Sequence, residues 1–156
     1  MVKTNVMRIL DKANIKYDVV EASNYNFING IEMAKYLNEP CEVCYKTIVT
    51  VGKSKNHYVF MLPVDKELDL KKCAKVSGEK SISPIHQKDL LGLTGYIHGG
   101  CSPLGMKKEF KTFIAIQAKE LDSFYFSGGK IGLQVKVKVN DLLKVLPFEF
   151  GDFIVN

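Results

Sequence analysis

The sequence has no long hydrophobic run, so we expect no membrane-spanning helix. None of its apolar segments approaches the roughly 18 residues that a membrane-spanning helix needs. The N-terminal residues also lack the continuous apolar stretch of a signal peptide, because Arg8, Asp11 and Lys12 interrupt it. No repeat, low-complexity tract or linker divides the 156 residues. We therefore expect a single domain over residues 1–156, long enough to bury a hydrophobic core of its own.

Cysteine is scarce, and charge of neither sign dominates. Four cysteines without a secretion signal predict reduced thiols and a cytoplasmic location. The net charge of +5 comes from 22 basic and 17 acidic side chains. This excess permits an RNA partner without pointing to one. With 46% hydrophobic and 25% charged residues, the composition is that of an ordinary soluble protein.

The hydrophobic pattern predicts a mixed α+β domain. Residues 133–139 alternate leucine and valine with polar residues, which is typical of a strand with one buried face. Segments 45–51 and 57–63 are rich in β-forming residues and predict a hairpin across a polar turn. Further strands are predicted at residues 15–20, 112–117 and 122–127, and helices at residues 2–13, 31–37, 70–76 and 140–146 and from Ser83–Pro84 onward, with Asp69 and Asn140 as N-caps and Pro84 at a first helical position.

A loop rich in glycine, at residues 95–105, is the most unusual segment of the chain. It reads GYIHGGCSPLG and combines four glycines with an aromatic ring, an imidazole and a thiol. Cys101 could be a nucleophile, but no activating base is evident in the sequence, and a lone histidine such as His98 is more often structural than catalytic. Gly99 and Gly100 instead let a ligand approach their backbone N–H groups, and Pro103 stiffens the loop. Consecutive N–H groups of this kind suit an anion or an oxyanion, so the backbone interpretation explains the glycines best.

Lysines offer further candidates for binding an anion. Lys46 shares a strand face with Ile48 and Thr50, and from the pattern alone a solvated side chain is favoured over one held in a cleft. Two clusters, Lys71-Lys72-Lys75 and Lys107-Lys108-Lys111, are each interpreted as a solvated face. Lys107 and Lys108 differ in following the glycine loop directly, where a nucleic-acid backbone could lie.

The pair Cys41 and Cys44 has the CxxC spacing of zinc and redox sites. Zinc needs a second pair of ligands, and the other cysteines and histidines show no matching spacing. A redox pair needs a helix N-terminus to lower the thiol pKa, yet a strand follows here. Coincidental cysteines are the favoured interpretation, with a zinc or thiol protein as the alternative.

Several motifs, taken in order, resemble the bacterial YbaK/EbsC family, free-standing relatives of the editing domain inserted into prolyl-tRNA synthetases. They are Tyr45-Lys46-Thr47, LDLKK at residues 68–72, TGYIHGGCSPLGMKK at residues 94–108, SGGKIGL at residues 127–133 and NDLLKVL at residues 140–146. The set spans nearly the whole chain. The resemblance implies a curved, mostly antiparallel mixed β-sheet that is partly closed into a barrel and surrounded by helices.

The activity implied by the resemblance is trans-editing: an aminoacyl-tRNA deacylase that removes cysteine from mischarged tRNA(Pro). It implies no metal and no cofactor, a tRNA partner, and prolyl-tRNA synthetase as a further candidate partner. The substrate's own thiol would attack its carbonyl and release the tRNA as a thiolactone forms, with water as the alternative nucleophile. A deacylase for alanine or serine, and a non-catalytic module that binds tRNA or a synthetase, remain as alternatives.

The resemblance also assigns roles to individual residues. Lys46 would hold the terminal adenosine or its phosphate, and the loop from Gly99 to Pro103 would polarise the ester carbonyl through backbone N–H groups. The expected catalytic groups are Lys46 and the backbone N–H groups of Gly99, Gly100 and Cys101; the expected substrate-binding residues are Tyr45, Thr47, His98, Ser102, Pro103, Gly128, Gly129 and Gln134; and the expected tRNA-binding residues are Lys107, Lys108 and Lys130.

Two positions depart from the family pattern. Gln134 stands where the family has an aspartate, and residues 20–23 replace a stretch that carries a tyrosine, with Tyr25 the nearest aromatic. Both positions border the pocket in the family, so the preferred amino acid is less well determined than the activity.

Overall fold

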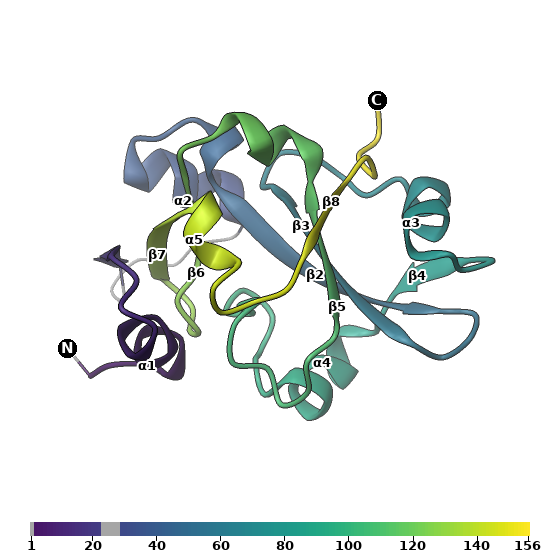
Figure 1. Ribbon diagram of the computed structural model, residues 1–156, viewed down its shortest axis with the longest axis horizontal. Coiled ribbons are helices and arrows are strands. Elements are labelled where there is room, and N and C mark those ends of the chain that lie inside the picture. The colour runs from purple at the N-terminus through teal and green to yellow at the C-terminus, as the bar shows by residue number, and fades with distance from the viewer. Residues whose placement is uncertain (1, 23–28) are drawn as a thin grey trace.

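The computed structural model describes residues 2–22 and 29–156, and it contains two β-sheets with helices around them (Figure 1). The helices are α1 (Asn5–Lys12), α2 (Gly30–Leu37), α3 (Leu70–Ser77), α4 (Gln87–Thr94) and α5 (Val139–Leu142), with short 3-10 helices η1 (Cys41–Val43) and η2 (Ile116–Glu120). The strands are β1 (Tyr17–Glu21), β2 (Tyr45–Gly52), β3 (His57–Pro63), β4 (Ile82–Pro84), β5 (Lys111–Ala115), β6 (Ser123–Ser127), β7 (Leu133–Lys138) and β8 (Glu149–Gly151).

The larger sheet has the strand order β4-β2-β3-β5-β8 and is mixed. The predicted hairpin forms its centre, with β2 antiparallel to β3, while β3–β5 and β5–β8 are parallel pairs. The smaller sheet has the order β1-β7-β6 and is antiparallel throughout. Its central strand β7 buries every second residue, as the alternation predicts.

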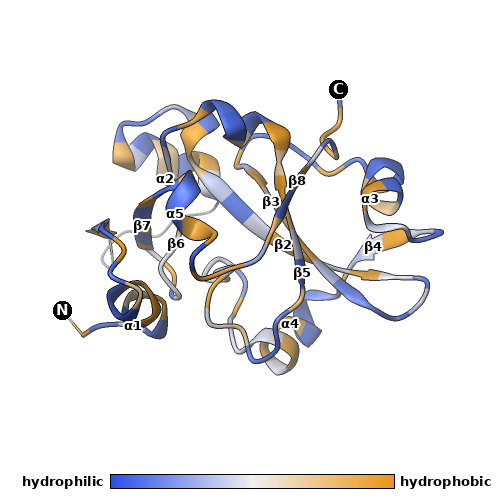
Figure 2. Ribbon diagram, viewed as in Figure 1, coloured by the Kyte–Doolittle hydropathy of each residue, from blue (hydrophilic) through white to orange (hydrophobic). Residues whose placement is uncertain are grey.

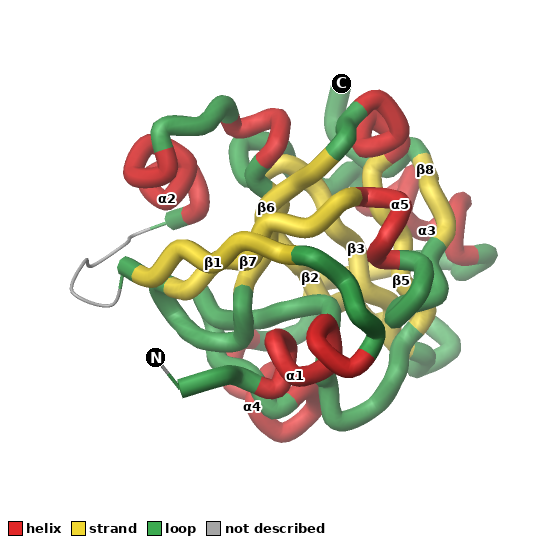
Figure 3. The backbone as a smooth tube through the Cα atoms, turned by 60° about the vertical axis from the view of Figure 1, so that its left-hand side comes forward, coloured by secondary structure: helices red, strands yellow, loops and turns green. Residues whose placement is uncertain are grey.

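The expectation that the sheet is partly closed into a barrel is wrong. A barrel needs hydrogen-bonded neighbours on both sides of every strand. In the described residues the two sheets are joined by one isolated bridge, between Cys44 and Tyr125, and β4 and β8 remain edge strands of the larger sheet. Figure 3 shows β1, β7 and β6 as a separate layer, with α1 and α2 beyond its two sides. The α+β class and the mostly antiparallel pairing are confirmed.

Aromatic side chains fill the core between the layers. Phe60 stacks on Phe113 with ring centroids 5.4 Å apart and meets Phe153 edge-on at 4.9 Å. Phe124 and Phe126 of β6 are fully buried. Helix α3, by contrast, carries both hydrophilic and hydrophobic residues in Figure 2, and its buried side chains, Cys73 and Ala74, are small. Within residues 2–22 and 29–156, no helix is long and apolar enough to cross a membrane.

The observed helix starts agree with one of the predicted N-terminal positions and differ from another. Asp69 caps α3 as predicted, because its carboxylate accepts from the N–H groups of Lys71 and Lys72, both at 3.1 Å. The predicted helix start at Ser83–Pro84 is wrong, since these residues form edge strand β4 and α4 begins at Gln87. An edge strand tolerates proline because one of its sides needs no N–H donor.

The predicted cap at Asn140 is also wrong. Helix α5 begins one residue earlier, at Val139, and no side chain caps it. Strand β7 runs straight into this helix, and the N–H of Val139 donates to the carbonyl of Asp122 at 3.0 Å. The first N–H group of α5 is therefore satisfied by the backbone carbonyl of Asp122, directly before β6, and not by a capping side chain.

Candidate functional site

Lys46 is the second residue of β2, and its side chain is half-buried. Burial lowers the pKa of its ammonium from the ordinary value of 10.5, while the carboxylates of Glu67 and Asp65 act in the opposite direction. Among the described residues, no hydrogen bond or ion pair to the ammonium is found. A half-buried cation without a direct partner is placed to receive an anion or another acceptor.

The bridge between the two sheets determines which residues share the face of Lys46. Cys44 pairs with Tyr125 in parallel, so the residues two positions further on, Lys46 and Ser127, leave their strands on the same side. Strands β2 and β6 run side by side here.

The antiparallel pairs extend this face across the smaller sheet. Ser127 pairs with Gln134, and Gln134 pairs with Val20. Four strands therefore present Lys46, Ser127, Gln134 and Val20 on one face. Ser127 is the member that the sequence-based assignments missed; its position directly before two glycines was the only available signal.

The departures from the family pattern fall on this same face. Gln134 is half-buried, and its amide donates to the carbonyl of Leu133 at 3.3 Å. Val20 belongs to the apolar cluster of Cys44 and Tyr125. Ser23 and Tyr25 lie outside the described residues.

Tyr45 and Thr47 alternate with Lys46, so their side chains leave β2 on the opposite face. The ring of Tyr45 meets Phe124 edge-on at 5.0 Å, and burial raises the pKa of its hydroxyl. The hydroxyls of Tyr45 and Thr47 are both buried and have no hydrogen-bond partner in the described part of the chain. The structure therefore places these two expected substrate-binding residues beneath Lys46 rather than beside it.

The glycine loop begins where α4 ends, at Gly95 in the left-handed conformation. His98 and Gly99 are exposed, and Gly99 has a positive φ of 88°. Gly100 is buried against the backbone of Lys130 and Ile131, where an added Cβ would lie 3.0–3.1 Å from backbone atoms. The loop and the turn that carries Lys130 therefore touch only because residue 100 has no side chain.

The hydrogen bonds of the loop decide which N–H groups remain available. The N–H of Gly100 donates to the carbonyl of Ile97 at 3.0 Å and is already used. The N–H groups of Gly99 and Cys101 donate to no group among the described residues. Ser102 is fully buried, and its hydroxyl accepts from Leu104 at 3.4 Å. Of the three N–H groups expected to stabilise an oxyanion, those of Gly99 and Cys101 therefore remain available in the described residues, while that of Gly100 holds the turn.

Cys101 contributes a half-buried thiol rather than an exposed one. It packs against the cluster of Val49, Val59 and Leu90. Burial raises the pKa of the Cys101 thiol to about 12, so the reactive thiolate is strongly disfavoured at neutral pH. The nucleophile interpretation of this residue loses its chemical basis.

The second glycine segment, residues 128–132, lies against the first. Gly129 has a φ of 105° and approaches the ring of Tyr96, and its N–H donates to the hydroxyl of Ser127 at 3.1 Å. The carbonyl of Gly128 accepts from Thr4 at 2.7 Å. The structure thus brings both glycine segments and the Ser127–Gln134 pair together.

The lysines expected to bind tRNA surround these segments. Lys130 forms an ion pair with Glu21 at 3.3 Å. Lys107 is exposed and reaches the carbonyl of Gly92 at 3.5 Å, and Lys108 is exposed as well. Pro103 is buried directly before Leu104 and lines a hollow of about 200 Å³ beneath the loop.

The pair Cys41 and Cys44 lies next to this face but lacks the character of a reactive pair. Burial raises the pKa of Cys41, and it raises that of Cys44 to about 12. In the described residues, no group of three or more histidine, cysteine, aspartate or glutamate side chains could hold a metal ion.

Comparison with known proteins places the chain among proteins of tRNA editing. The model of the aminoacyl-tRNA editing domain matches residues 31–145. A protein of Enterococcus faecalis (strain ATCC 700802 / V583), named as a Cys-tRNA(Pro)/Cys-tRNA(Cys) deacylase, EbsC, is 38% identical over 151 residues, covering 96% of this chain and 92% of its own.

Solved structures show the same fold at low identity. The hypothetical protein APE2540 superposes with a TM-score of 0.89 at 16% identity, covering 97% of this chain and all of its own. A protein described as a trans-editing enzyme for prolyl-tRNA synthetase superposes with a TM-score of 0.81 at 18% identity, covering 99% of this chain and all of its own. The motifs around Lys46 and the two glycine segments fall inside the matched region, and the chain belongs to the aminoacyl-tRNA editing domain family.

Proposed function

We propose that this aminoacyl-tRNA deacylase acts in trans and removes cysteine from mischarged tRNA(Pro). The observation that carries the proposal is the 38% identity, over 96% of the chain, to a protein named for cysteinyl-tRNA deacylation. The face shared by Lys46, Ser127 and Gln134 supports the proposal by offering a cation, and the glycine loop, which contacts the segment that follows Ser127, supports it by offering backbone donors.

Lys46 holds the acylated end of the tRNA in this proposal. Its ammonium interacts with the terminal adenosine or its phosphate and so positions the ester. Half-burial supports this role, because an ion pair is stronger where less water screens it. The absence of a direct protein partner among the described residues leaves the ammonium free for the substrate.

The glycine loop polarises the ester carbonyl. The N–H groups of Gly99 and Cys101, which have no acceptor in the described part of the chain, donate to the oxygen as negative charge develops on it. The hydrogen bond from Gly100 to Ile97 keeps the turn rigid. Donors fixed before the reaction need no reorganisation in the transition state, which is where such a site gains its rate.

The nucleophile in this proposal comes from the substrate. The cysteine thiol attacks its own carbonyl carbon, the C–S bond forms and the ester C–O bond breaks. The thiol proton passes to the departing ribose oxygen, so that a thiolactone and free tRNA result. The protonated, half-buried Cys101 supports this route, because its raised pKa disfavours a competing thiolate in the loop.

The tRNA backbone lies along Lys107, Lys108 and Lys130 in this proposal. All three are exposed, and they flank the two glycine segments. Prolyl-tRNA synthetase is the partner that would confine the activity to tRNA(Pro). No metal or organic cofactor takes part.

The test is side-by-side hydrolysis of cysteinyl-, seryl-, alanyl- and prolyl-tRNA(Pro) by the purified protein, with a thiol trap for the thiolactone. We expect cysteine to be removed fastest, serine and alanine far more slowly, and proline not at all. Alanine fits wherever cysteine fits, so pocket size alone cannot produce this order, whereas an internal nucleophile can.

Each alternative has its own outcome in this assay. Equal rates for cysteine and alanine, or no trapped thiolactone, would leave a positioned water as the nucleophile. Preferred removal of alanine or serine would change the assigned amino acid. Binding of tRNA without any hydrolysis would identify a non-catalytic module. Cysteinyl-tRNA(Cys) is included as a further substrate, because its hydrolysis would show that tRNA identity is not read by this chain alone.

A further inference from the structure

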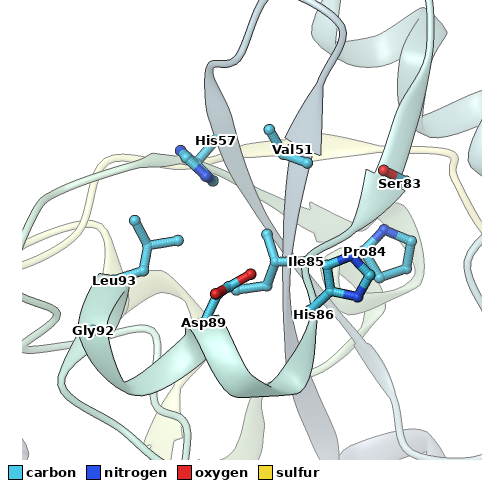
Figure 4. Close-up of a pocket in the computed structure, with 9 residues that line it drawn as sticks. All are labelled: Val51, His57, Ser83, Pro84, Ile85, His86, Asp89, Gly92 and Leu93. Carbon is cyan, nitrogen blue, oxygen red and sulfur yellow. The ribbon is translucent and has the colours of Figure 1, made fainter.

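A second hollow lies between the β2–β3 hairpin and α4. Its volume is about 410 Å³, which is within the range of small-ligand sites. Figure 4 shows side chains entering it from two elements: Val51 and His57 from the β2–β3 hairpin, and Asp89 and Leu93 from α4, with His86 at the helix start. None of these residues has a role in the proposed ester chemistry.

The walls of this groove suit a flat aromatic ligand. Val51 and Leu93 supply apolar surface, and His57 and His86 supply imidazole rings. Phe110 supports His57, with ring centroids 5.4 Å apart. Nucleobases stack on rings of this kind in proteins that bind single-stranded RNA.

Gly92 is the feature that packing does not explain. It lies in the interior of α4, where glycine weakens a helix relative to alanine. A Cβ at this position would meet nothing within 4 Å, and the backbone does not have a positive φ. What its missing side chain provides is open space in the groove, because Gly92 is one of the lining residues.

The charges of the groove point to one class of ligand. The carboxylate of Asp89 points into the hollow and can only accept hydrogen bonds. Among the four RNA bases, guanine offers a carboxylate two neighbouring N–H donors, at N1 and N2. At the rim, Lys107 reaches the carbonyl of Gly92, which places an ammonium where a phosphate of the same strand would pass.

We infer that this groove binds a nucleobase of the tRNA substrate, with guanine preferred, beyond the site where the ester is cleaved. The inference rests on the proposed function for the identity of the strand. Helix α4 is about 12 Å long and ends at Gly95, where the glycine loop starts, so a few nucleotides reach from the loop to the groove. Val51, His57, Asp89 and Gly92 hold the base, and Lys107 holds its phosphate.

The test titrates the full-length protein with 5′-GMP and, separately, with 5′-UMP while the histidine ring resonances are followed by NMR. We expect GMP to shift the resonances of His57 and His86 but not that of His98 in the ester site, with a Kd on the order of 1 mM. Asp89→Asn should reduce the preference for GMP over UMP about tenfold, since one bidentate pair is lost. Asp141→Asn is the matched control: it also removes a carboxylate from the first turn of a helix, α5, and should keep the preference.

Gly92→Ala separates a binding role from a structural one. It should raise the melting temperature, because it replaces glycine in a helix without a clash, and at the same time weaken GMP binding several-fold. Asp89→Asn should also raise the KM for charged tRNA and leave kcat unchanged. Unperturbed His57 and His86 at saturating GMP, or an unchanged GMP preference in Asp89→Asn, would overturn the inference. Deacylation is measured on the same preparation. Normal deacylation without GMP binding refutes the groove alone, whereas GMP binding without deacylation supports the groove and refutes the proposed function.

Discussion

Replacing Gly100 by alanine tests whether the glycine loop works through its backbone. The added Cβ would lie 3.0 Å from the nitrogen of Ile131 and 3.1 Å from the Cα and carbonyl carbon of Lys130. All three are backbone atoms, so no side chain can rotate away. The turn is itself fixed, because Gly128 donates to the carbonyl of Leu133 at 2.8 Å. The loop must therefore move away from the turn by a few tenths of an ångström.

The size of the effect follows from this geometry. Overpacking of this kind costs about 1–3 kcal/mol of unfolding free energy. For a chain of 156 residues this corresponds to a loss of about 3–9 °C in melting temperature. Turnover should fall by about tenfold or more, because the N–H groups of Gly99 and Cys101 move with the loop and a misplacement of 1 Å can cost about a hundredfold.

The assay pairs thermal unfolding with hydrolysis of cysteinyl-tRNA(Pro). Gly151→Ala is the matched control, since Gly151 is also buried but a Cβ there meets its nearest atoms at 3.5 Å, an ordinary contact distance. We expect the control to keep its turnover. A Gly100→Ala protein with the melting temperature and turnover of the wild type would refute the reasoning, because the loop could then tolerate a side chain at its contact with the turn.

Other predictions concern Lys46 and the thiols. Lys46→Met should lower kcat/KM by about a hundredfold or more without lowering the melting temperature, because it removes a fixed cation together with the cost of half-burying it. If the ammonium is needed, activity is lost as the pH rises through the lowered pKa of Lys46, so the alkaline limb of the pH–rate profile should lie below pH 10.5. In an active Lys46→Arg variant this limb should move to higher pH, because the guanidinium stays protonated. A wild-type limb above pH 10.5 would contradict the role. Cys101→Ser should retain most of the turnover that Gly100→Ala loses, and a dead Cys101→Ser protein beside an active Gly100→Ala protein would restore the nucleophile. Changing Cys41 and Cys44 together to serine should also preserve deacylation, with no zinc in the wild-type protein by elemental analysis; loss of activity accompanied by bound zinc would support the metal interpretation.

Local patterns in the sequence were sufficient for the elements whose stability is local. The alternation of residues 133–138 predicted β7, and Asp69 predicted the start of α3. Ser83–Pro84 misled because the strand there depends on a distant partner: Thr50 pairs with Pro84, and Ile85 donates to the carbonyl of Val49 at 3.2 Å. Proline is tolerated both in the first turn of a helix and on an edge strand, so the sequence alone does not distinguish these two structures. Tertiary contacts determine which of them forms.

The site was harder to predict, because its arrangement arises from contacts between distant segments. From the pattern of β2 alone, Lys46 was expected to be solvated. Strand β6 lies beside β2 through the bridge from Cys44 to Tyr125, and the pattern of β2 alone does not contain that contact. The family motifs identified the lysine as important, but they could not reveal that Ser127 shares its face. The partly closed barrel was implied by the family resemblance, and it is wrong because one isolated bridge joins the two sheets in the described residues.

The arrangement of Gly100 explains why this site needs glycine more than it needs a reactive side chain. An N–H group can stabilise an oxyanion only if it is both unbonded and held still. The N–H of Gly100 is itself hydrogen-bonded to the carbonyl of Ile97, so it is not available to an oxyanion. That bond, together with the contact of the Gly100 Cα with the backbone of Lys130 and Ile131, holds the neighbouring N–H groups still. The N–H groups of Gly99 and Cys101, on either side of this fixed point, then have no acceptor among residues 2–22 and 29–156. Catalysis of this kind depends on how closely two backbone segments approach, so the substitutions with the largest effect should be those that add atoms to the loop, and removal of its thiol should matter least.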